Sequence, residues 1–350
     1  MRISPRTGGD GRPGHALTQH PTVFLHVANG TSTTGTIHDA GIPGESSIWA
    51  DPLHDGPVPA GASDDELLEI RARHLAGEEH GVEANIEGLR RWRQIIDDHR
   101  AYDEIVLWYE HDLFDQLNLI QVLSRLAVPA PWPKPVSLIC IGSFPGRPRF
   151  KGLGELTASE LAPLFETRQP VTAAHYAVAV SAWAAFRAPE PTSIEAFLRT
   201  DTSALPYLAA ALERHLEEFP STVDGLSRTE HRLLELAAPA PIRLRAAFPR
   251  MHDEETAYYV TDDTLLDVAL ELSSPFAPLL MLKDRGASGH PARAGLTGTI
   301  ELTDLGRAVL AGREDRIACC GIDRWLGGVH LSGTGPHWRW DRAHERVVWV

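Results

Sequence analysis

The segment that follows the apolar run IVLWY holds Glu110, His111, Asp112 and Asp115 within six residues. A charge at the end of a buried run is costly unless it is paired or used, so these side chains are candidates for chemistry. Glu110 and His111 are the preferred pair for moving a proton. The structural alternative is that the acids cap the helix that begins here, because a helix N-terminus attracts negative charge.

A second segment, WADPLHDGPVP, carries Asp51, His54 and Asp55 between prolines that restrict the backbone. A carboxylate beside His54 would orient its imidazole as a general acid or base near neutral pH. Carboxylate and imidazole are also ordinary metal ligands, so Asp51, His54, Glu110 and His111 form an alternative set for a divalent cation. The structural alternative is that Asp51 caps a turn while His54 is exposed.

Two more segments have the composition of anion-binding loops. NGTSTTG joins a strand to a helix N-terminus, where free N–H groups favour an anion, although it has neither the P-loop spacing nor the dinucleotide fingerprint. SFPGRPRFKGLG supplies cations that complement phosphate or carboxylate. A capped turn and a solvated basic loop are the respective alternatives. The candidate ligand-binding residues are Asn29, Thr31, Ser32, Asp55, Asp112, Asp115, Arg147, Arg149 and Lys151.

The elements around these segments predict how they are positioned. Apolar runs predict strands within residues 22–30, 46–50, 102–112 and 136–144, and helical spacing occurs over 64–77, 84–99 and 114–127. Alternating strands and helices indicate an α/β fold, a mainly parallel sheet with helices on both faces. Ligands of such sheets bind beyond the carboxyl ends of the strands. The loops starting at Asn29, Asp51, Glu110 and Ser143 are therefore expected to converge on one crevice.

Pattern changes along the chain predict its organisation. We expect a flexible arm over residues 1–21, an α/β domain over 22–155, a helical extension over 156–220 and a winged-helix-like α+β domain over 221–350. The last expectation rests on three helical patterns followed by the late hairpin GGVHLSGTGPHWRWD.

Composition limits the protein class. The 350 residues are 43% hydrophobic and 23% charged, which excludes global disorder, and the formal charge of −14 disfavours nucleic acid as a partner. The three cysteines form neither a disulfide framework nor a metal-type spacing. No run approaches the roughly 20 apolar residues of a membrane span, and residues 1–19 lack the apolar middle of a secretion signal. We expect a cytoplasmic protein without membrane contact.

Five segments together resemble a bacterial family whose N-terminal domain is known only as a domain of unknown function. They are HVANGTSTTGTI, WADPLHDGPVP, LWYEHDLFDQL, SFPGRPRFKGLGEL and DGLSRTEHRLLELA, and the likeness covers residues 22–240. It implies an α/β domain with a helical extension, and neither an activity nor a cofactor. The C-terminal part resembles winged-helix domains through ELTDLGRAVLAG and the hairpin after it.

The residues predict an enzyme for hydrolysis or group transfer on a small anionic ligand, phosphorylated or nucleotide-like, with a divalent metal ion as the candidate cofactor. No Ser or Cys stands in a recognisable nucleophile elbow, which disfavours covalent acyl chemistry. Two alternatives stay open, a ligand-responsive winged-helix regulator and a non-catalytic binding protein. The substrate and the oligomeric state are not predicted.

Overall fold

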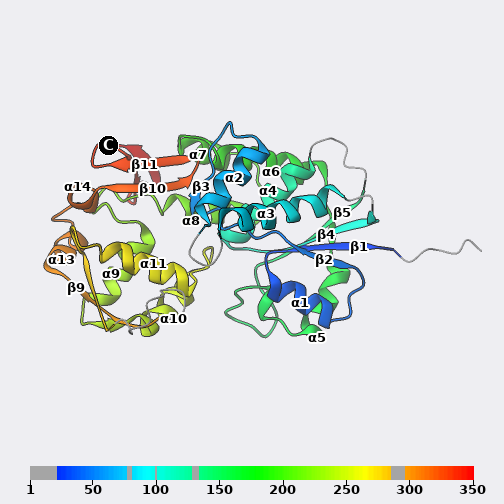
Figure 1. The fold of residues 1–350 in the computed structure, drawn as a ribbon, viewed down its shortest axis with the longest axis horizontal. Helices are drawn as coiled ribbons and strands as arrows, with labels where there is room; N and C mark the ends of the chain where they lie inside the picture. Colours follow the sequence, from blue (N-terminus) through cyan, green and yellow to red (C-terminus); the bar gives the residue numbers. More distant parts are fainter. Residues whose placement is uncertain (1–21, 77–80, 99–100, 128–133, 285–295) are drawn as a thin grey trace, which may run out of the picture.

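A five-stranded sheet organises the first half of the chain in a computed structural model that describes residues 22–76, 81–98, 101–127, 134–284 and 296–350 (Figure 1). The predicted arm over residues 1–21 lies outside these ranges. The strands, in spatial order, are β2 (Glu45–Ile48), β1 (Phe24–Ala28), β4 (Glu104–Glu110), β5 (Val136–Ile141) and β6 (Gln169–Pro170). All neighbours are parallel except β5 and β6. The expected α/β fold with a mainly parallel sheet is confirmed.

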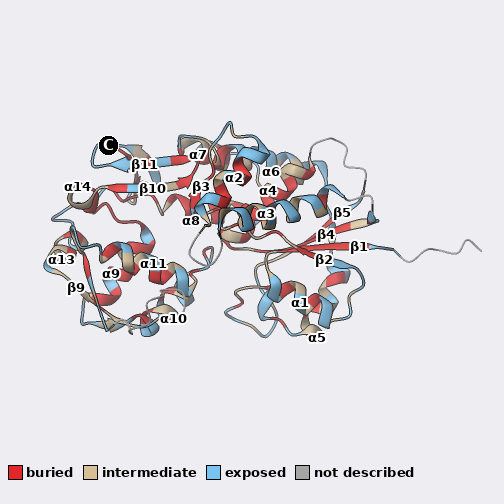
Figure 2. Cartoon of the chain, viewed as in Figure 1, coloured by how far each residue is buried: buried red, intermediate tan, exposed pale blue. Residues whose placement is uncertain are grey.

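Helices cover both faces of this sheet because successive side chains of β4 point to opposite sides. Val106 and Trp108 pack in one core cluster with Ile37 of α1 (Thr31–Asp39) and Leu161 of α5 (Ala158–Leu161). Ile105, Leu107 and Tyr109 face a larger cluster that includes α4 (Leu113–Leu126). Figure 2 shows the resulting burial along β1 and β4.

The other helices of the first 220 residues lie mainly on the α4 side (Figure 1). They are α2 (Asp64–His74), α3 (Val82–Asp97), α6 (Ala173–Phe186), α7 (Thr192–Leu198) and α8 (Leu208–Leu216), with 3-10 turns at Leu153–Glu155 and Ala162–Thr167. Residues 156–220 are mainly helical, as the sequence predicts. None of the described helices is both long and apolar enough to cross a membrane.

The later part of the chain combines helices with short antiparallel sheets. Its helices are α9 (Arg228–Ala237), α10 (Leu244–Glu254), α11 (Asp262–Leu272), α13 (Asp304–Leu310) and α14 (Arg316–Cys320). One sheet has the order β7 (Ile242–Arg243), β9 (Thr299–Leu302), β8 (Leu280–Lys283). The larger core cluster continues from β4 into α9 and α11, through Leu233 and Leu265. The two halves therefore share one apolar core.

The C-terminal strands form two β-hairpins, where the sequence predicts one hairpin from GGVHLSGTGPHWRWD with RVVWV. β10 (Ile322–Gly327) pairs with β11 (Val329–Gly333), and β12 (Trp338–Asp341) pairs with β13 (Arg346–Trp349). The difference lies in the two glycines read as the start of the hairpin, which form the turn between β10 and β11. Gly327 has a φ of 61°, and a Cβ on Gly328 would lie 1.9 Å from the carbonyl oxygen of Arg187. Only glycine fits this turn.

Strand β10 joins the two parts of the chain that the sequence divides near residue 221. It pairs in parallel with β3 (Gly56–Pro57), where Leu326 is the partner of Gly56. The Val58 amide donates to the carbonyl of Gly327 at 2.8 Å, and the Gly328 amide donates to Phe186 at 3.0 Å. These bonds fix the end of the WADPLHDGPVP segment against the C-terminal half.

Candidate functional site

A cavity of about 1090 Å³ lies where the loops after β1, β2 and β4 meet helices α9 and α11. Its wall includes residues 29–33, His54, Asp55, the acids of residues 110–115 and Lys151. From the second half, Tyr258 and side chains of α11 and β10 complete the wall. Three of the four loops expected to converge thus reach one cavity directly, and the loop from Ser143 reaches it through residues 151–155.

Three carboxyl groups at the end of β4 come close together. Glu110, Asp112 and Asp115 each offer an oxygen, and these oxygens lie within 4.8 Å of one another. All three are buried, with exposures of 3%, 5% and 1%. Among the described residues, none of them forms an ion pair. We call these three residues the acid triad.

The local sequence explains why the acid triad forms. Asp112 is the N-cap of α4, and its Oδ1 accepts from the Asp115 amide at 3.0 Å, so the expected capping role holds for this oxygen. Asp115, in the first helical turn, accepts from the Glu110 amide at 2.9 Å. The Leu153 amide donates to Glu110 Oε1. The chain thus folds back on itself and brings three acids to one point.

Burial and mutual repulsion disfavour the charged forms of the acid triad. Burial, and then Asp112, raise the pKa of Glu110 to about 7. Burial raises the pKa of Asp112 well above its usual range, with Asp115 adding to the effect. The pKa of Asp115 rises for the same reasons, with Glu110 as the neighbour. A bound cation would lower these pKa values and displace protons.

Asn29 links the acid triad to the N-terminus of α1. Its Nδ2 donates to Glu110 Oε2 and Asp115 Oδ2, both at 2.7 Å, and its Oδ1 accepts from the Thr33 hydroxyl at 3.2 Å. Helix α1 begins after Gly30 with neither a side-chain cap nor an acid in its first turn. Thr31 and Ser32 line the cavity there. The positive end of the α1 helix dipole therefore lies close to the acid triad.

Asp51 has a different environment from the one expected of a catalytic or metal-binding group. Arg71 of α2 donates two hydrogen bonds to Asp51 Oδ1, at 3.0 and 2.7 Å, and the two side chains are 1% and 5% exposed. Asp51 lies outside the cavity lining. The four residues of the alternative metal set, Asp51, His54, Glu110 and His111, are not brought together. Among the described residues, only Glu110 of that set belongs to a cluster with metal-ligand spacing.

The two predicted histidines are separated. His54 lines the cavity, with its ring 5.6 Å from Tyr258 and 6.1 Å from Phe114, and its buried Nδ1 has no described partner. Burial lowers the pKa of His54. His111 packs beside Phe150 and Tyr207 outside the lining. Of these two histidines, only His54 lines the cavity.

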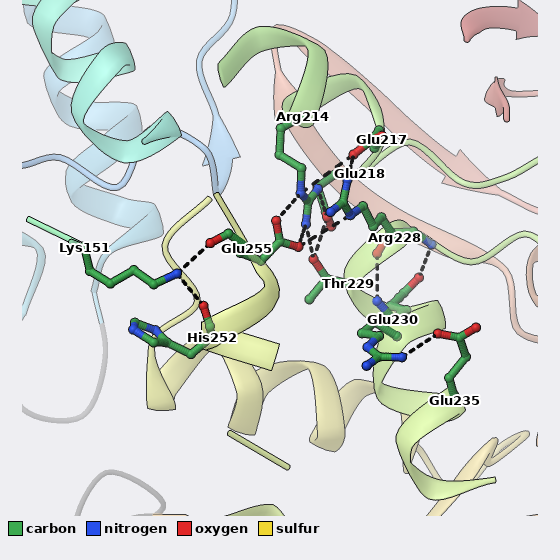
Figure 3. A network of polar contacts seen from close by, with 12 residues as sticks. Lys151, Arg214, Glu217, Glu218, Arg228, Thr229, Glu230, Glu235, His252 and Glu255 are labelled. Carbon is green, nitrogen blue, oxygen red and sulfur yellow. Dashed lines mark hydrogen bonds and ion pairs between the residues drawn. The ribbon is translucent and has the colours of Figure 1, made fainter. Parts of the chain in front are cut away.

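The predicted cations are already engaged. Arg147 pairs with Glu160 at 2.8 Å and Arg149 with Asp253 at 2.5 Å, and neither lines the cavity. Lys151 does line it, but its Nζ donates to the carbonyls of His252 and Glu255 at 2.7 and 2.6 Å (Figure 3). Arg149 and Lys151 thus join loop 143–155 to the second half of the chain, whereas Arg147 pairs within the first half.

Asp55 lines the cavity and contacts a histidine of α2. Its Oδ2 lies 3.0 Å from His74 Nε2. Burial alone would raise the pKa of Asp55, but the hydrogen bond with His74 outweighs it and the pKa is lowered. Asp55 is therefore a paired carboxylate, unlike the acid triad.

Several cavity residues carry no local sequence signal of function. His215 lies inside the helical pattern LPYLAAALERHLEEF, and Tyr258 lies between helices. Asp263 and Asp267, four positions apart on α11, would pass for solvated helix charges. A four-residue spacing does predict that these two acids share a face of α11, but nothing in the sequence says that this face lines the cavity.

The comparisons with known proteins add no family. No family model matches this chain, and no curated protein matches it. The resemblance carried by the five sequence segments therefore stays a prediction.

Proposed function

We propose that this chain is an enzyme for hydrolysis or group transfer on a small phosphorylated ligand, which binds in the cavity together with a divalent cation. The observation that carries the proposal is the acid triad, three buried carboxylates without an ion-pair partner among the described residues, at the wall of a cavity of about 1090 Å³. Closely spaced buried acids with raised pKa values at the wall of a cavity are typical of functional sites.

The spacing of the acid triad suits a hard cation. Mg²⁺ and Ca²⁺ bind oxygen at roughly 2.0 to 2.6 Å, so oxygens on opposite sides of the ion lie roughly 4.0 to 5.2 Å apart. The triad oxygens fall within 4.8 Å of one another. Such an ion would supply charge neutralisation to a bound phosphate.

The N-terminus of α1 is the natural place for the anion. No side chain caps the first N–H groups of α1, and Thr31, Ser32 and Thr33 line the cavity at this helix end. Asn29 connects this helix end to Glu110 and Asp115. The anion therefore depends on backbone N–H groups and a cation rather than on Arg147 and Arg149.

His54 is the candidate for proton transfer. Its ring contacts Phe114, which lies between Asp112 and Asp115 in the chain, and its lowered pKa keeps the imidazole neutral at pH 7. Of the four residues expected to be catalytic, His54 and Glu110 line the cavity, whereas Asp51 and His111 do not.

The test combines metal binding with turnover. Mn²⁺ should raise the thermal unfolding midpoint, and Mn²⁺ or Mg²⁺ should support phosphate release from a panel of nucleoside phosphates and sugar phosphates. Glu110→Gln should remove both effects. Asp263→Asn, which removes another cavity carboxylate, is the matched control and should keep the Mn²⁺ shift. A Mn²⁺ shift without turnover of any panel member would favour a binding protein, and no shift at all would refute the proposal.

The regulator remains the second candidate because of the element order in the second half. Helix α9, strand β7, helices α10 and α11, and strands β8 and β9 follow one another as in a winged helix. In that arrangement α11 would be the helix that reads DNA, yet its Asp263, Asp267 and Glu271 line the acidic cavity. We therefore propose that the winged helix serves as a cavity wall. Tight duplex-DNA binding with a steep salt dependence would reverse this preference.

A further inference from the structure

Tyr259 is an exposed tyrosine in the wall of the cavity that holds the acid triad. It lines this cavity and is 42% exposed. Among the described residues, nothing hydrogen-bonds to its hydroxyl. A phenol carries one O–H donor, and a few polar groups placed in an otherwise apolar wall are what orients a ligand in such cavities. Tyr259 is therefore accessible to a ligand and has a donor to offer it.

The backbone before Tyr259 lies against the acid triad. Tyr259 belongs to residues 255–261, which connect α10 to α11. The amide of Leu113, the residue after Asp112, donates to the carbonyl of Ala257 at 2.8 Å. This bond joins the connection to the first turn of α4, two residues before the tyrosine.

The ring of Tyr259 is held in place by His252. The two rings are nearly perpendicular, at 84°, with their centroids 5.1 Å apart. His252 Nδ1 lies 3.1 Å from the carbonyl oxygen of Val260, and the His252 carbonyl accepts from Lys151 Nζ at 2.7 Å (Figure 3). A side chain whose support is fixed in this way loses less conformational freedom when it binds a ligand.

Carboxyl groups surround the phenol of Tyr259. Burial, followed by Glu155, Asp112 and Glu110, raises the pKa of Tyr259 above its usual value. The hydroxyl therefore keeps its proton at neutral pH and acts as a neutral donor. Two of the three acids that raise its pKa belong to the acid triad.

The third acid, Glu155, places Tyr259 near the N-terminus of α1 as well. Two residues before Glu155, the Leu153 amide donates to the acid triad. Between them, the Gly154 carbonyl accepts from the Ser32 hydroxyl of α1 at 3.1 Å. Residues 153–155 thus link the two features that the proposed function assigns to the cation and the phosphate, and Tyr259 borders both.

A phosphate at this point of the cavity depends on neutral donors. Of the predicted cations, Arg147 and Arg149 lie outside the lining, and Lys151 is engaged by backbone carbonyls. The N–H groups of α1 are one set of neutral donors. We propose that Tyr259 is a substrate-binding residue, whose hydroxyl donates a hydrogen bond to an oxygen of the phosphate that the cation at the acid triad also binds. This inference rests on the proposed function for the positions of cation and phosphate.

The test is isothermal titration calorimetry of inorganic phosphate into the full chain with saturating Mn²⁺. Tyr259→Phe removes the hydroxyl and keeps the ring against His252. It should weaken phosphate binding about tenfold or more, as expected for one lost hydrogen bond to a charged group. Tyr176→Phe, which removes a hydroxyl of α6 outside the cavity lining, is the matched control and should bind phosphate as the wild-type chain does. Without phosphate, all three proteins should bind Mn²⁺ equally well.

The outcomes separate the two proposals. Wild-type phosphate affinity in Tyr259→Phe would overturn the substrate-binding role. Loss of Mn²⁺ affinity in Tyr259→Phe without phosphate would also overturn it, because the tyrosine would then act on the acid triad and not on the ligand. In both cases, Mn²⁺-dependent phosphate binding that Glu110→Gln removes would still support the proposed function. A wild-type chain that binds no phosphate in the presence of Mn²⁺ would overturn both proposals.

Discussion

Asp51 and the acid triad are both buried carboxylate sites at the carboxyl edge of the same sheet, yet their electrostatic environments are opposite. Asp51 lies against the Arg71 guanidinium, 2.7 Å from Nη2. Glu110, Asp112 and Asp115 lie against one another, and among the described residues no cation pairs with them. The comparison shows that burial of an acid does not by itself indicate function. The charge of the neighbouring side chains distinguishes the structural carboxylate from the candidate site.

The difference has an energetic consequence. The Arg71 guanidinium compensates the desolvation of the Asp51 carboxylate and holds the loop before His54. Asp51 therefore needs no cation from a ligand. In the acid triad, burial and repulsion raise the pKa values, to about 7 for Glu110. A cation that binds there would stabilise the ionised forms of the three acids and displace their protons.

The largest effect is expected when the paired site loses its cation. Arg71→Met should lower the free energy of unfolding by about 3 to 5 kcal/mol, because it leaves Asp51 buried and unpaired. Arg73→Met, which removes an exposed partner of Glu69 on the same helix, should cost only about 0 to 1 kcal/mol. Urea denaturation of both variants measures this. Equal costs would mean that the Asp51–Arg71 pair is not structural.

A second prediction extends the comparison to a buried imidazole. The folded pKa of His215 is about 4, below its value of 6.5 when unfolded, so the unfolded chain binds this proton more tightly. Its contribution to stability is therefore full above pH 6.5 and is lost as the pH falls toward 4, by up to about 3 kcal/mol. Urea denaturation between those pH values should show a shallower decline for His215→Phe than for the wild-type chain. Parallel declines would show that His215 is not buried as a neutral ring.

The sequence was sufficient where the signal is local and insufficient where it depends on distant residues. The run IVLWY and the acids after it predict strand β4, helix α4 and acidic side chains between them. They do not predict that Glu110 clusters with Asp112 and Asp115, because the expected partner of Glu110 was His111. The Arg71 partner of Asp51 lies 20 residues away, on a helix whose direction the pattern does not fix. Tyr258 belongs to the second half of the chain and meets the loops of the first half because the two halves share a core.

The smallest effect is expected at the predicted anion-binding cations. Arg149 is 73% exposed at its side chain and pairs with Asp253. Arg149→Ala should change the free energy of unfolding by about 0 to 1 kcal/mol and leave phosphate affinity in the presence of Mn²⁺ unchanged. Calorimetric titration with inorganic phosphate checks this. A marked loss of phosphate affinity would show that loop 143–155 is part of the anion-binding site.

The most direct test of the account is the number of Mn²⁺ ions bound per chain, counted by electron paramagnetic resonance of free Mn²⁺ in wild-type protein, Glu110→Gln and Asp263→Asn. We expect one tight Mn²⁺ site in the wild-type chain, which Glu110→Gln abolishes and Asp263→Asn retains. Mn²⁺ affinity should also increase as the pH rises through about 7, where Glu110 loses its proton. Equal Mn²⁺ binding by all three proteins would contradict the assignment of the acid triad as the metal site.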